Sequence, residues 1–216
     1  MSYQKTDRSR VRQVAKRGHY DEATVHAIFD DAFVAQVAFQ VEGQPYQIPM
    51  LYAREGHTIY LHGSPKSRIY QQLSTGLACC LGVTHVDGLV IARSAFHHSV
   101  NYRSVVAYGK CRPVEEVEEK LRVFALFTNT IVPGRWEECR PMTEKEARVT
   151  GILAFEIEEA SAKIRTGGPV DDAEDYALPI WAGVIPIEKR FGQWEADPAM
   201  KEPNPVPASI KKLLDQ

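Results

Sequence analysis

Short runs of β-forming residues, separated by turn signals, fill the first half of the chain and constrain its fold more than any other feature. Turn residues stand at EGQP (42–45), at REGHT (54–58) and at the DG pair (87–88), which is typical of a hairpin. The runs cover residues 33–42, 46–54, 58–63, 77–86, 89–98 and 103–114, and later runs cover 152–159 and 181–187. Short antiparallel strands joined by tight turns favour a β-barrel over a parallel sheet.

Three helices are predicted around these strands. The first covers 21–32, where Asp21 can cap it and apolar residues recur at helical spacing. The second lies in 64–76 and ends at Gly76. The third covers 115–132, has acidic residues in its first turn, and has a predicted buried stripe of Val117, Leu121, Phe124 and Ile131. Residues 143–150 add a helical turn or two.

We interpret the chain as one domain with two extensions. A basic N-terminal arm covers 1–18, a single barrel domain covers 19–190, and an extended, proline-rich tail covers 191–216. Within the domain, the barrel core is assigned to 33–113 and 151–187, and a helical insert to 115–148. The N-terminal arm is interpreted as solvated, although its basic residues could also contact phosphates.

Charge and cysteine usage exclude several classes of protein. The net charge of −2 argues against a nucleic-acid partner, which usually requires a strong basic excess. No apolar run reaches about 18 residues, so no membrane span is expected. The N-terminus lacks the apolar core of a secretory signal. The four cysteines have no CxxC spacing and are predicted to be reduced thiols, so we expect a cytoplasmic protein.

A dense polar stretch lies between two apolar runs at residues 93–103. It includes the adjacent His97 and His98, followed by Asn101, Tyr102 and Arg103. Neighbouring side chains on a strand face opposite ways, so the two histidines are not expected to chelate one ion. No spaced Cys/His set or HExxH motif is present, and we therefore predict no metal site. The simplest alternative is that one histidine packs inward and the other meets solvent or a partner.

The sequence GSPKSR at 63–68 is a candidate phosphate site. Ser64 and Pro65 form a good N-cap and first helical position, which places Lys66, Ser67 and Arg68 in the first turn. Positive charge there opposes the helix dipole, which makes sense if an anion is bound as well. A solvated helix start with incidental basic residues is an equally good interpretation. The sequence contains no GxSxG motif of a serine hydrolase and no GxGxxG or GxxxxGK[ST] phosphate loop. A serine hydrolase and a Rossmann or P-loop nucleotide site are therefore not expected.

The order of these segments resembles a known family. YQIPMLYAREGHTIYLHGSPKSRIYQQL, then HHSVNYRSVVAYGKCRPV, and later ILAFEIEEASAKIR, are similar to the flavin-nucleotide-binding split-barrel proteins. These proteins are related to pyridoxamine 5′-phosphate oxidase and include the nitroimidazole-resistance proteins. The resemblance implies a mainly β fold: a six-stranded antiparallel split barrel of Greek-key type with flanking helices. It also implies a homodimer that binds two FMN molecules at its interface.

The resemblance assigns roles to particular positions. Pro49, Met50 and Leu51 would offer backbone groups along the isoalloxazine edge. The phosphate end would lie at His62, Ser64, Lys66, Ser67 and Arg68, where the family often has an Arg-Lys pair. Arg103 and Ser104 would reach the flavin from the partner chain, with Ser104 in place of the usual glutamine, and Tyr102 would border the space beside the flavin ring. His97 or His98 would stand beside the flavin ring as the catalytic candidate.

The resemblance does not identify the substrate. The oxidase's C-terminal substrate motif, an arginine and a histidine close together, has no counterpart, because Arg190 lacks a matching histidine. We expect an FMN-dependent oxidoreductase that acts on a small, planar molecule such as a nitroaromatic or heteroaromatic compound. A flavin carrier or sensor without turnover, and a haem protein with a histidine of the HH pair as axial ligand, are alternatives. Trp181 is predicted in the core, and the acidic 160–180 loop as a solvated insertion rather than a lid.

Overall fold

Six antiparallel strands close into a barrel, as the sequence predicts. The computed structural model describes residues 1–201 and 204–214. The barrel strands are β2 (Val34–Val41), β3 (Gln44–Glu55), β4 (Thr58–Gly63), β5 (Ala78–Ile91), β6 (Ser99–Val114) and β7 (Gly151–Arg165). Their order is β7-β4-β3-β2-β5-β6, and pairing of β6 with β7 closes the ring. The short β1 (Gly18–His19) pairs with β7, and β8 (Gly183–Pro186) pairs with β5, both outside the ring.

Alternation along each strand fills the barrel interior. On β7, the predicted inward residues Leu153, Phe155 and Ile157 are all buried in the main core. The same core takes Tyr52 from β3 and Leu61 from β4. It is completed by buried residues of the other strands and helices, including Val25, Phe29, Val37, Ile59, Leu73, Leu81 and Val105. A second, smaller core lies outside the ring, between β4, β7 and the helix α3 (Val117–Ile131).

The helices flank the barrel. They are α1 (Glu22–Asp30), α2 (Arg68–Leu73), α3 (Val117–Ile131), α4 (Glu144–Val149) and α5 (Ala208–Leu214), with short 3-10 turns η1 (Ala15–Arg17), η2 (Ala95–His97), η3 (Trp136–Glu138) and η4 (Ala173–Ala177). Asp21 caps α1 as expected, because its side chain accepts a hydrogen bond from the Thr24 amide at 2.8 Å. Within the described residues, none of these helices combines the length and apolar character that crossing a membrane requires.

The predicted buried stripe of α3 is only partly right: Phe124 packs half-buried against the smaller core, but none of the four predicted residues is fully buried. The buried residues are Lys120, Val123 and Phe127, whereas Ile131 is exposed. Lys120 can be buried because its ammonium donates to the carbonyl oxygens of Ala147 and Thr150, at 3.3 and 2.9 Å, around the end of α4. A prediction that selects buried positions by apolarity alone overlooks Lys120, because its burial depends on carbonyl oxygens at the end of α4.

The predicted hairpin at Asp87–Gly88 is also wrong. Strand β5 runs straight through this position, with only a register shift against β6 between Val86 and Gly88. The glycine serves a different purpose: a Cβ there would lie 3.1 Å from the Ile185 carbonyl oxygen. Gly88 therefore allows β8 to approach β5 closely.

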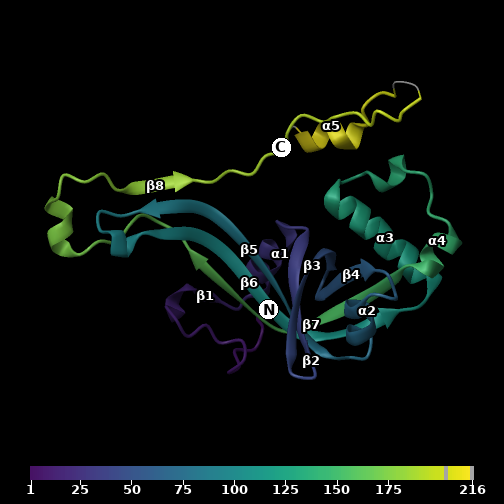
Figure 1. Cartoon of the computed structure of the whole chain (residues 1–216), viewed down its shortest axis with the longest axis horizontal. Coiled ribbons are helices and arrows are strands. Elements are labelled where there is room, and N and C mark those ends of the chain that lie inside the picture. Colours follow the sequence, from purple (N-terminus) through teal and green to yellow (C-terminus); the bar gives the residue numbers. More distant parts are fainter. Residues whose placement is uncertain (202–203, 215–216) are drawn as a thin grey trace.

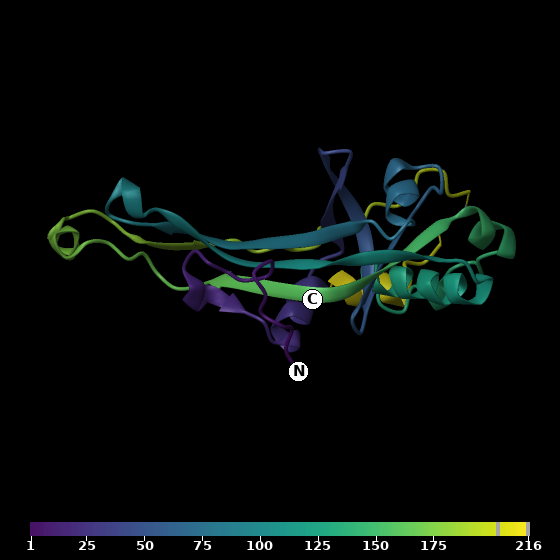
Figure 2. The same cartoon turned by 90° about the horizontal axis from the view of Figure 1, so that it is seen from below.

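The actual turn of the β5–β6 hairpin lies at residues 92–98, so both strands extend well past the barrel. We call this projection the arm: residues 86–102 together with 166–187, which contain η4 and β8. Figure 1 shows the arm at one end of the molecule and α3 and α4 at the other, and Figure 2 shows the same separation from a second side.

The N-terminal segment packs on the barrel, which corrects its interpretation as solvated. Tyr3 and Ser9 are buried, and the Tyr3 amide donates to the Tyr20 carbonyl oxygen at 2.8 Å. Arg8 forms an ion pair with Glu159 of β7 at 2.6 Å. At the other end of the chain, α5 is held near η3 by a hydrogen bond from the Ser209 amide to Glu138 at 3.2 Å.

Candidate functional site

The residues predicted to bind flavin fall into two groups that do not meet within one chain. One group lies around the loop between β4 and α2, and the other lies along the arm and at its base. In Figure 1 these regions stand on opposite sides of the barrel. A single chain therefore does not bring all the predicted residues together, and one ligand could contact both groups only if a second copy supplied one of them.

A small hollow opens beside the loop between β4 and α2. It measures about 10 Å³, roughly the space of one water molecule. Its walls are Met50, Leu61, His62, Gly63, Ser67, Ile69, Tyr70 and Leu153, from β3, β4, α2 and β7. Gly151 makes room for Tyr70, because a Cβ at 151 would lie 2.5 Å from the tyrosine ring. Three predicted residues, Met50, His62 and Ser67, thus line one hollow, which is too small to enclose a flavin.

The loop itself differs from the prediction in where the helix begins. Ser67, rather than Ser64, is the N-cap of α2: its hydroxyl accepts from the Tyr70 amide at 3.4 Å and donates to the Ser64 carbonyl oxygen at 2.7 Å. Ser64 stabilises the preceding turn, where its hydroxyl accepts from the Lys66 amide at 3.2 Å. Ser64 and Ser67 each begin a turn, so the sequence alone offered two equivalent N-cap positions.

Both basic side chains of this loop lack a carboxylate partner within the part of the chain that the structure describes. Among residues 1–201 and 204–214, no acidic oxygen lies within 4.0 Å of the Lys66 ammonium or the Arg68 guanidinium. The Arg68 guanidinium instead lies over the Tyr46 ring, 4.7 Å from its centre. Lys66 and Arg68 are exposed and stand on either side of Ser67 in the sequence, so the loop gathers two cations and a hydroxyl that can hold a phosphate.

Strand β3 offers backbone groups next to this loop. It pairs with β2 from Gln44 to Leu51 and with β4 from Tyr52 to Glu55. Pro49, Met50 and Leu51 therefore have a single strand neighbour. Pro49 lacks an amide hydrogen, and the Tyr52 amide donates toward β2, to the Phe33 carbonyl oxygen. By the alternation of an antiparallel ladder, the Met50 amide also faces β2, and the Leu51 amide is the one that faces the open edge. This is the opening of the split barrel.

His62 lies between the hollow and α3. Its ring packs edge-on against Phe127 and Phe124, with centroid distances of 4.7 and 6.1 Å. Burial lowers the pKa of the imidazole, so the ring is neutral near pH 7. His62 is consequently unsuited to binding a phosphate through charge.

Arg103 is already occupied by its own chain. Its guanidinium donates to both carboxylate oxygens of Asp87, at 3.0 and 2.9 Å, and to Asp31 at 2.8 Å. The hydrogen bonds from the guanidinium lower the pKa of the Asp87 carboxyl. The Ser104 hydroxyl likewise donates to the Lys163 carbonyl oxygen at 3.3 Å. A flavin contact from Arg103 would have to compete with two carboxylates.

Sequence reasoning missed His85, which completes this cluster at the base of the arm. The side chain is only 2% exposed. Its Nε2 lies 3.0 Å from the Ile28 carbonyl oxygen, so Nε2 carries the hydrogen, and Nδ1 accepts from the Lys189 ammonium at 3.2 Å. The only available signal was the alternation of β5, which places residue 85 on the same face as Leu81 and Val83.

The two adjacent histidines lie at the tip of the arm, in and just after the 3-10 turn η2 rather than on the strand that the sequence predicted, and they point to different partners. His97 Nε2 lies 3.3 Å from an Asp172 oxygen. His98 Nδ1 donates to the Ser94 carbonyl oxygen at 3.0 Å, which leaves its Nε2 lone pair free in an exposed position. Tyr102 is half-buried in β6, opposite Arg165 of β7.

The segment that covers the arm corrects two expectations. Trp181, predicted in the core, is 66% exposed. The acidic loop is not simply solvated, because the Asp171 side chain is fully buried and accepts hydrogen bonds from the amides of Arg93 and Ser94. Residues 166–187 therefore fold back along the hairpin as part of the arm.

Comparison with known proteins gives consistent results. The sequence profile of a family described as pyridoxamine 5′-phosphate oxidase matches residues 21–164. The structure of the flavocytochrome Anf3 from Azotobacter vinelandii is 39% identical, with a TM-score of 0.90, over 96% of this chain and 97% of that one. The structure of the FAD and haem binding protein from Mycobacterium smegmatis is 30% identical, with a TM-score of 0.88, over 92% and 97%.

More distant structures share the fold alone. A protein from Bacteroides thetaiotaomicron, described as a candidate 5-nitroimidazole antibiotic resistance protein, is 20% identical with a TM-score of 0.58, over 67% of this chain and 84% of that one. None of the curated proteins matches the sequence significantly.

Proposed function

Because this chain belongs to the pyridoxamine 5′-phosphate oxidase family, we propose that it is a homodimeric redox protein that binds a flavin nucleotide between two copies of itself. The observation that carries this proposal is the loop of Lys66, Ser67 and Arg68, in which two exposed cations have no carboxylate partner in the described chain and the hydroxyl of Ser67 lies between them in the sequence. A phosphate supplies the missing negative charge.

The flavin phosphate next to the ribityl chain is the group that this loop would hold. FMN and FAD share that phosphate, so the loop by itself fits either cofactor. The sequence resemblance favours FMN, whereas the Mycobacterium smegmatis relative is described as binding FAD. The ring would lie along Met50 and Leu51, where β3 has only one strand neighbour. When bound, a flavin supplies transfer of hydride or single electrons.

A second copy is needed on geometric grounds. The hollow beside Ser67 holds only about one water molecule, so a flavin must lie across its mouth and be covered by something else. The arm carries the apolar surface that could cover it, with Val86, Leu89, Val100, Leu178, Ile180, Val184, Ile185 and Ile187 all exposed. Exposed apolar groups in such number are typical of an interface.

Haem binding is a second candidate function. Two relatives that are at least 30% identical along nearly their whole length are described as a flavocytochrome and as an FAD and haem binding protein. His98 has the geometry of an axial ligand: Nδ1 donates to a backbone carbonyl oxygen, and Nε2 keeps a free lone pair. His98 is therefore the residue that we assign to the haem iron.

The substrate class remains a small planar molecule, and turnover distinguishes an oxidoreductase from a flavin carrier. Pyridoxamine phosphate is not assigned, because Arg190 has no matching histidine and its side chain pairs with Glu188 at 2.9 Å. In a protein without haem, His98, with its exposed Nε2, would be better placed than His97 to exchange a proton with a substrate; a bound haem iron would occupy that nitrogen.

The experiment is to purify the protein, record its visible spectrum, and identify the released cofactors by chromatography. We expect a flavin, and a Soret band that is lost in His98→Ala but retained in His97→Ala. Oxidation of a reduced nicotinamide cofactor, with or without a nitro compound, then tests turnover. Protein that binds neither FMN nor FAD at micromolar concentration would refute the proposal.

A further inference from the structure

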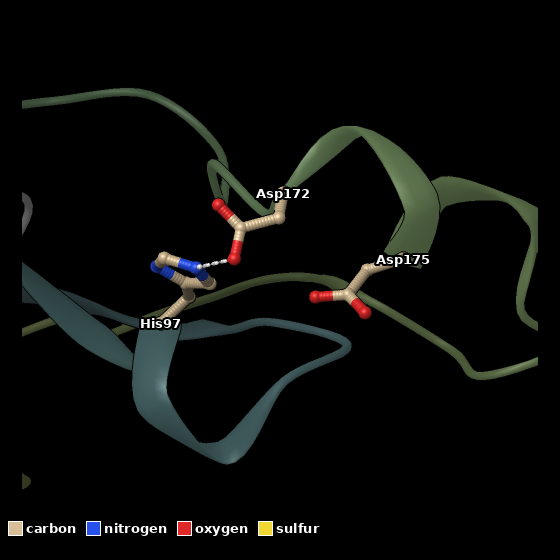
Figure 3. Close-up of side chains that lie close together, drawn as sticks. All are labelled: His97, Asp172 and Asp175. Atoms are coloured by element: carbon tan, nitrogen blue, oxygen red, sulfur yellow. Dashed lines mark hydrogen bonds and ion pairs between the residues drawn. The ribbon is translucent and has the colours of Figure 1, made fainter.

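Three potential metal ligands meet at the tip of the arm. His97 comes from η2, and Asp172 and Asp175 come from the start of η4, about 75 positions later in the chain. Their nitrogen and carboxylate oxygen atoms all lie within 4.8 Å of one another. Figure 3 shows the imidazole on the hairpin turn facing the two carboxylates on the neighbouring segment.

A buried carboxylate fastens these two segments together. Asp171, whose side chain is fully buried, accepts from the amides of Arg93 and Ser94 at 3.0 and 3.1 Å. The Ser94 hydroxyl in turn accepts from the Phe96 amide at 3.3 Å and caps η2. Each ligand thus stands within a few residues of the Asp171 contact, so the site is held in place before any ion arrives.

The charge around these ligands is not balanced. Arg93, the basic residue of this tip, is engaged elsewhere: its guanidinium pairs with Asp171 at 3.3 Å and lies 4.9 Å from the centre of the Tyr176 ring. In the part of the chain that the structure describes, neither Asp172 nor Asp175 has a lysine or arginine within 4.0 Å. In the described chain, the two carboxylates therefore have the His97 imidazole beside them but no lysine or arginine, and an imidazole is neutral when it acts as a metal ligand.

The spacing suits a transition-metal ion. His97 Nε2 and the Asp172 oxygen are 3.3 Å apart, which is long for a hydrogen bond between nitrogen and oxygen. It equals the separation of about 3.3–3.6 Å between two ligands of a tetrahedral ion with bonds of about 2.0–2.2 Å. The Asp175 oxygen, at most 4.8 Å from the others, comes into range with a movement of about 1 Å.

We propose that His97, Asp172 and Asp175 bind one divalent first-row transition ion, with Zn²⁺ as the reference, and that water completes its coordination. The imidazole selects such an ion over Mg²⁺ or Ca²⁺, which prefer oxygen ligands alone. The site ties the hairpin turn to the segment that covers it. The proposal does not depend on flavin or haem binding, since His98 and Arg68 take no part in it.

The test is equilibrium dialysis of the purified full-length protein against Zn²⁺, with the bound metal measured by elemental analysis. We expect one Zn²⁺ per chain, not displaced by excess Mg²⁺, and a loss of affinity of roughly tenfold or more in His97→Ala and in Asp172→Asn. His98→Ala is the matched control: it removes an adjacent exposed histidine and should leave Zn²⁺ affinity unchanged.

Two outcomes would overturn the site. One is the absence of stoichiometric Zn²⁺ binding, and the other is an equal effect of His97→Ala and His98→Ala, which would indicate adventitious binding to surface histidines. Asp172→Asn keeps the test valid if His97→Ala fails to fold, because Asp172 is largely exposed. Cofactor content, measured in the same samples, separates failure of the metal site from failure of flavin or haem binding.

Discussion

The arm extends two of the six barrel strands, β5 and β6, and is covered by the segment that follows β7. The barrel and the arm nevertheless differ in what they do with apolar residues. Inside the barrel, Phe29, Tyr52 and Phe155 are almost completely buried. On the arm, Phe96 is 88% exposed, and most of the apolar residues around it are also partly open to solvent. The barrel buries its own apolar side chains, whereas the arm leaves many of its apolar side chains exposed.

This difference indicates which parts of the molecule are open to ligands and partners. A barrel with a closed core is stable by itself, because burial of apolar surface is the main stabilising term in folding. An apolar projection costs solubility unless a partner covers it. The polar groups most relevant to function also stand outside the barrel, at the loop of Arg68, at the arm's base and at its tip.

The difference in burial between the two regions can be tested most directly with one phenylalanine from each. Phe155→Ala in the barrel should lower the free energy of unfolding by about 3–5 kcal/mol, because it removes a buried ring and leaves a cavity. Phe96→Ala on the arm should change it by less than about 0.5 kcal/mol. Urea unfolding followed by circular dichroism measures both. Similar losses in the two variants would show that the arm is part of the core.

The next largest effect should appear in association. Ile185→Asp places a carboxylate on the apolar arm and should raise the dimer dissociation constant by about 100-fold, or about 2.7 kcal/mol, since a charge is costly in an apolar interface. Val149→Asp, on the exposed surface of α4, is the control and should leave association unchanged. Analytical ultracentrifugation distinguishes the two. A dimer that tolerates Ile185→Asp would place the interface elsewhere.

Flavin affinity tests the other side of the molecule. Arg68→Ala should weaken flavin binding by about 1.5–3 kcal/mol, the value of a hydrogen bond to a charged group. Arg140→Ala, whose side chain pairs with Glu146 near α4, should have no effect. Fluorescence titration with FMN and with FAD measures the change for each cofactor. Equal retention of flavin in both variants would remove Arg68 from the phosphate site.

The smallest effect concerns pH at the base of the arm. The pKa of Asp87 is lowered by its hydrogen bonds from Arg103, so its contribution to stability is present above the unfolded carboxyl pKa and is lost as pH falls through the lower folded value. Asp87→Asn should therefore destabilise the protein at pH 7, by about 1 kcal/mol for a partly exposed pair. The difference from the unmodified protein should shrink below about pH 4.

Thermal unfolding across the pH range checks this prediction. Asp7→Asn is the control, because Asp7 pairs with Arg12 at 3.5 Å between two highly exposed side chains. A deficit in Asp87→Asn that persists at low pH would mean that the asparagine disturbs packing rather than charge.

Local patterns allowed much of the fold to be predicted. The alternation of Leu153, Phe155 and Ile157 and the cap at Asp21 depend only on near neighbours in the sequence, and the structure confirms both. The hairpin expected at Gly88 was wrong because the same dipeptide also suits the close approach of a third strand. Lys120 was overlooked because its burial depends on carbonyl groups of α4.

The candidate sites divide in the same way. The basic loop at 64–68 was recognisable in the sequence, because its charges and hydroxyls are adjacent, although the cap lies at Ser67 rather than Ser64. The pairing of His97 with Asp172, and the engagement of Arg103 by Asp31 and Asp87, join residues that are far apart in the chain. No spacing rule could have found them.

The sequence by itself determined which residues form strands, which face of each strand is apolar and where cations gather, because these properties follow from the backbone's period and from side-chain chemistry. The tertiary structure alone decided which distant groups meet and that the β5–β6 hairpin projects beyond the barrel. Those outcomes depend on long-range packing, in which many segments compete for the same partners.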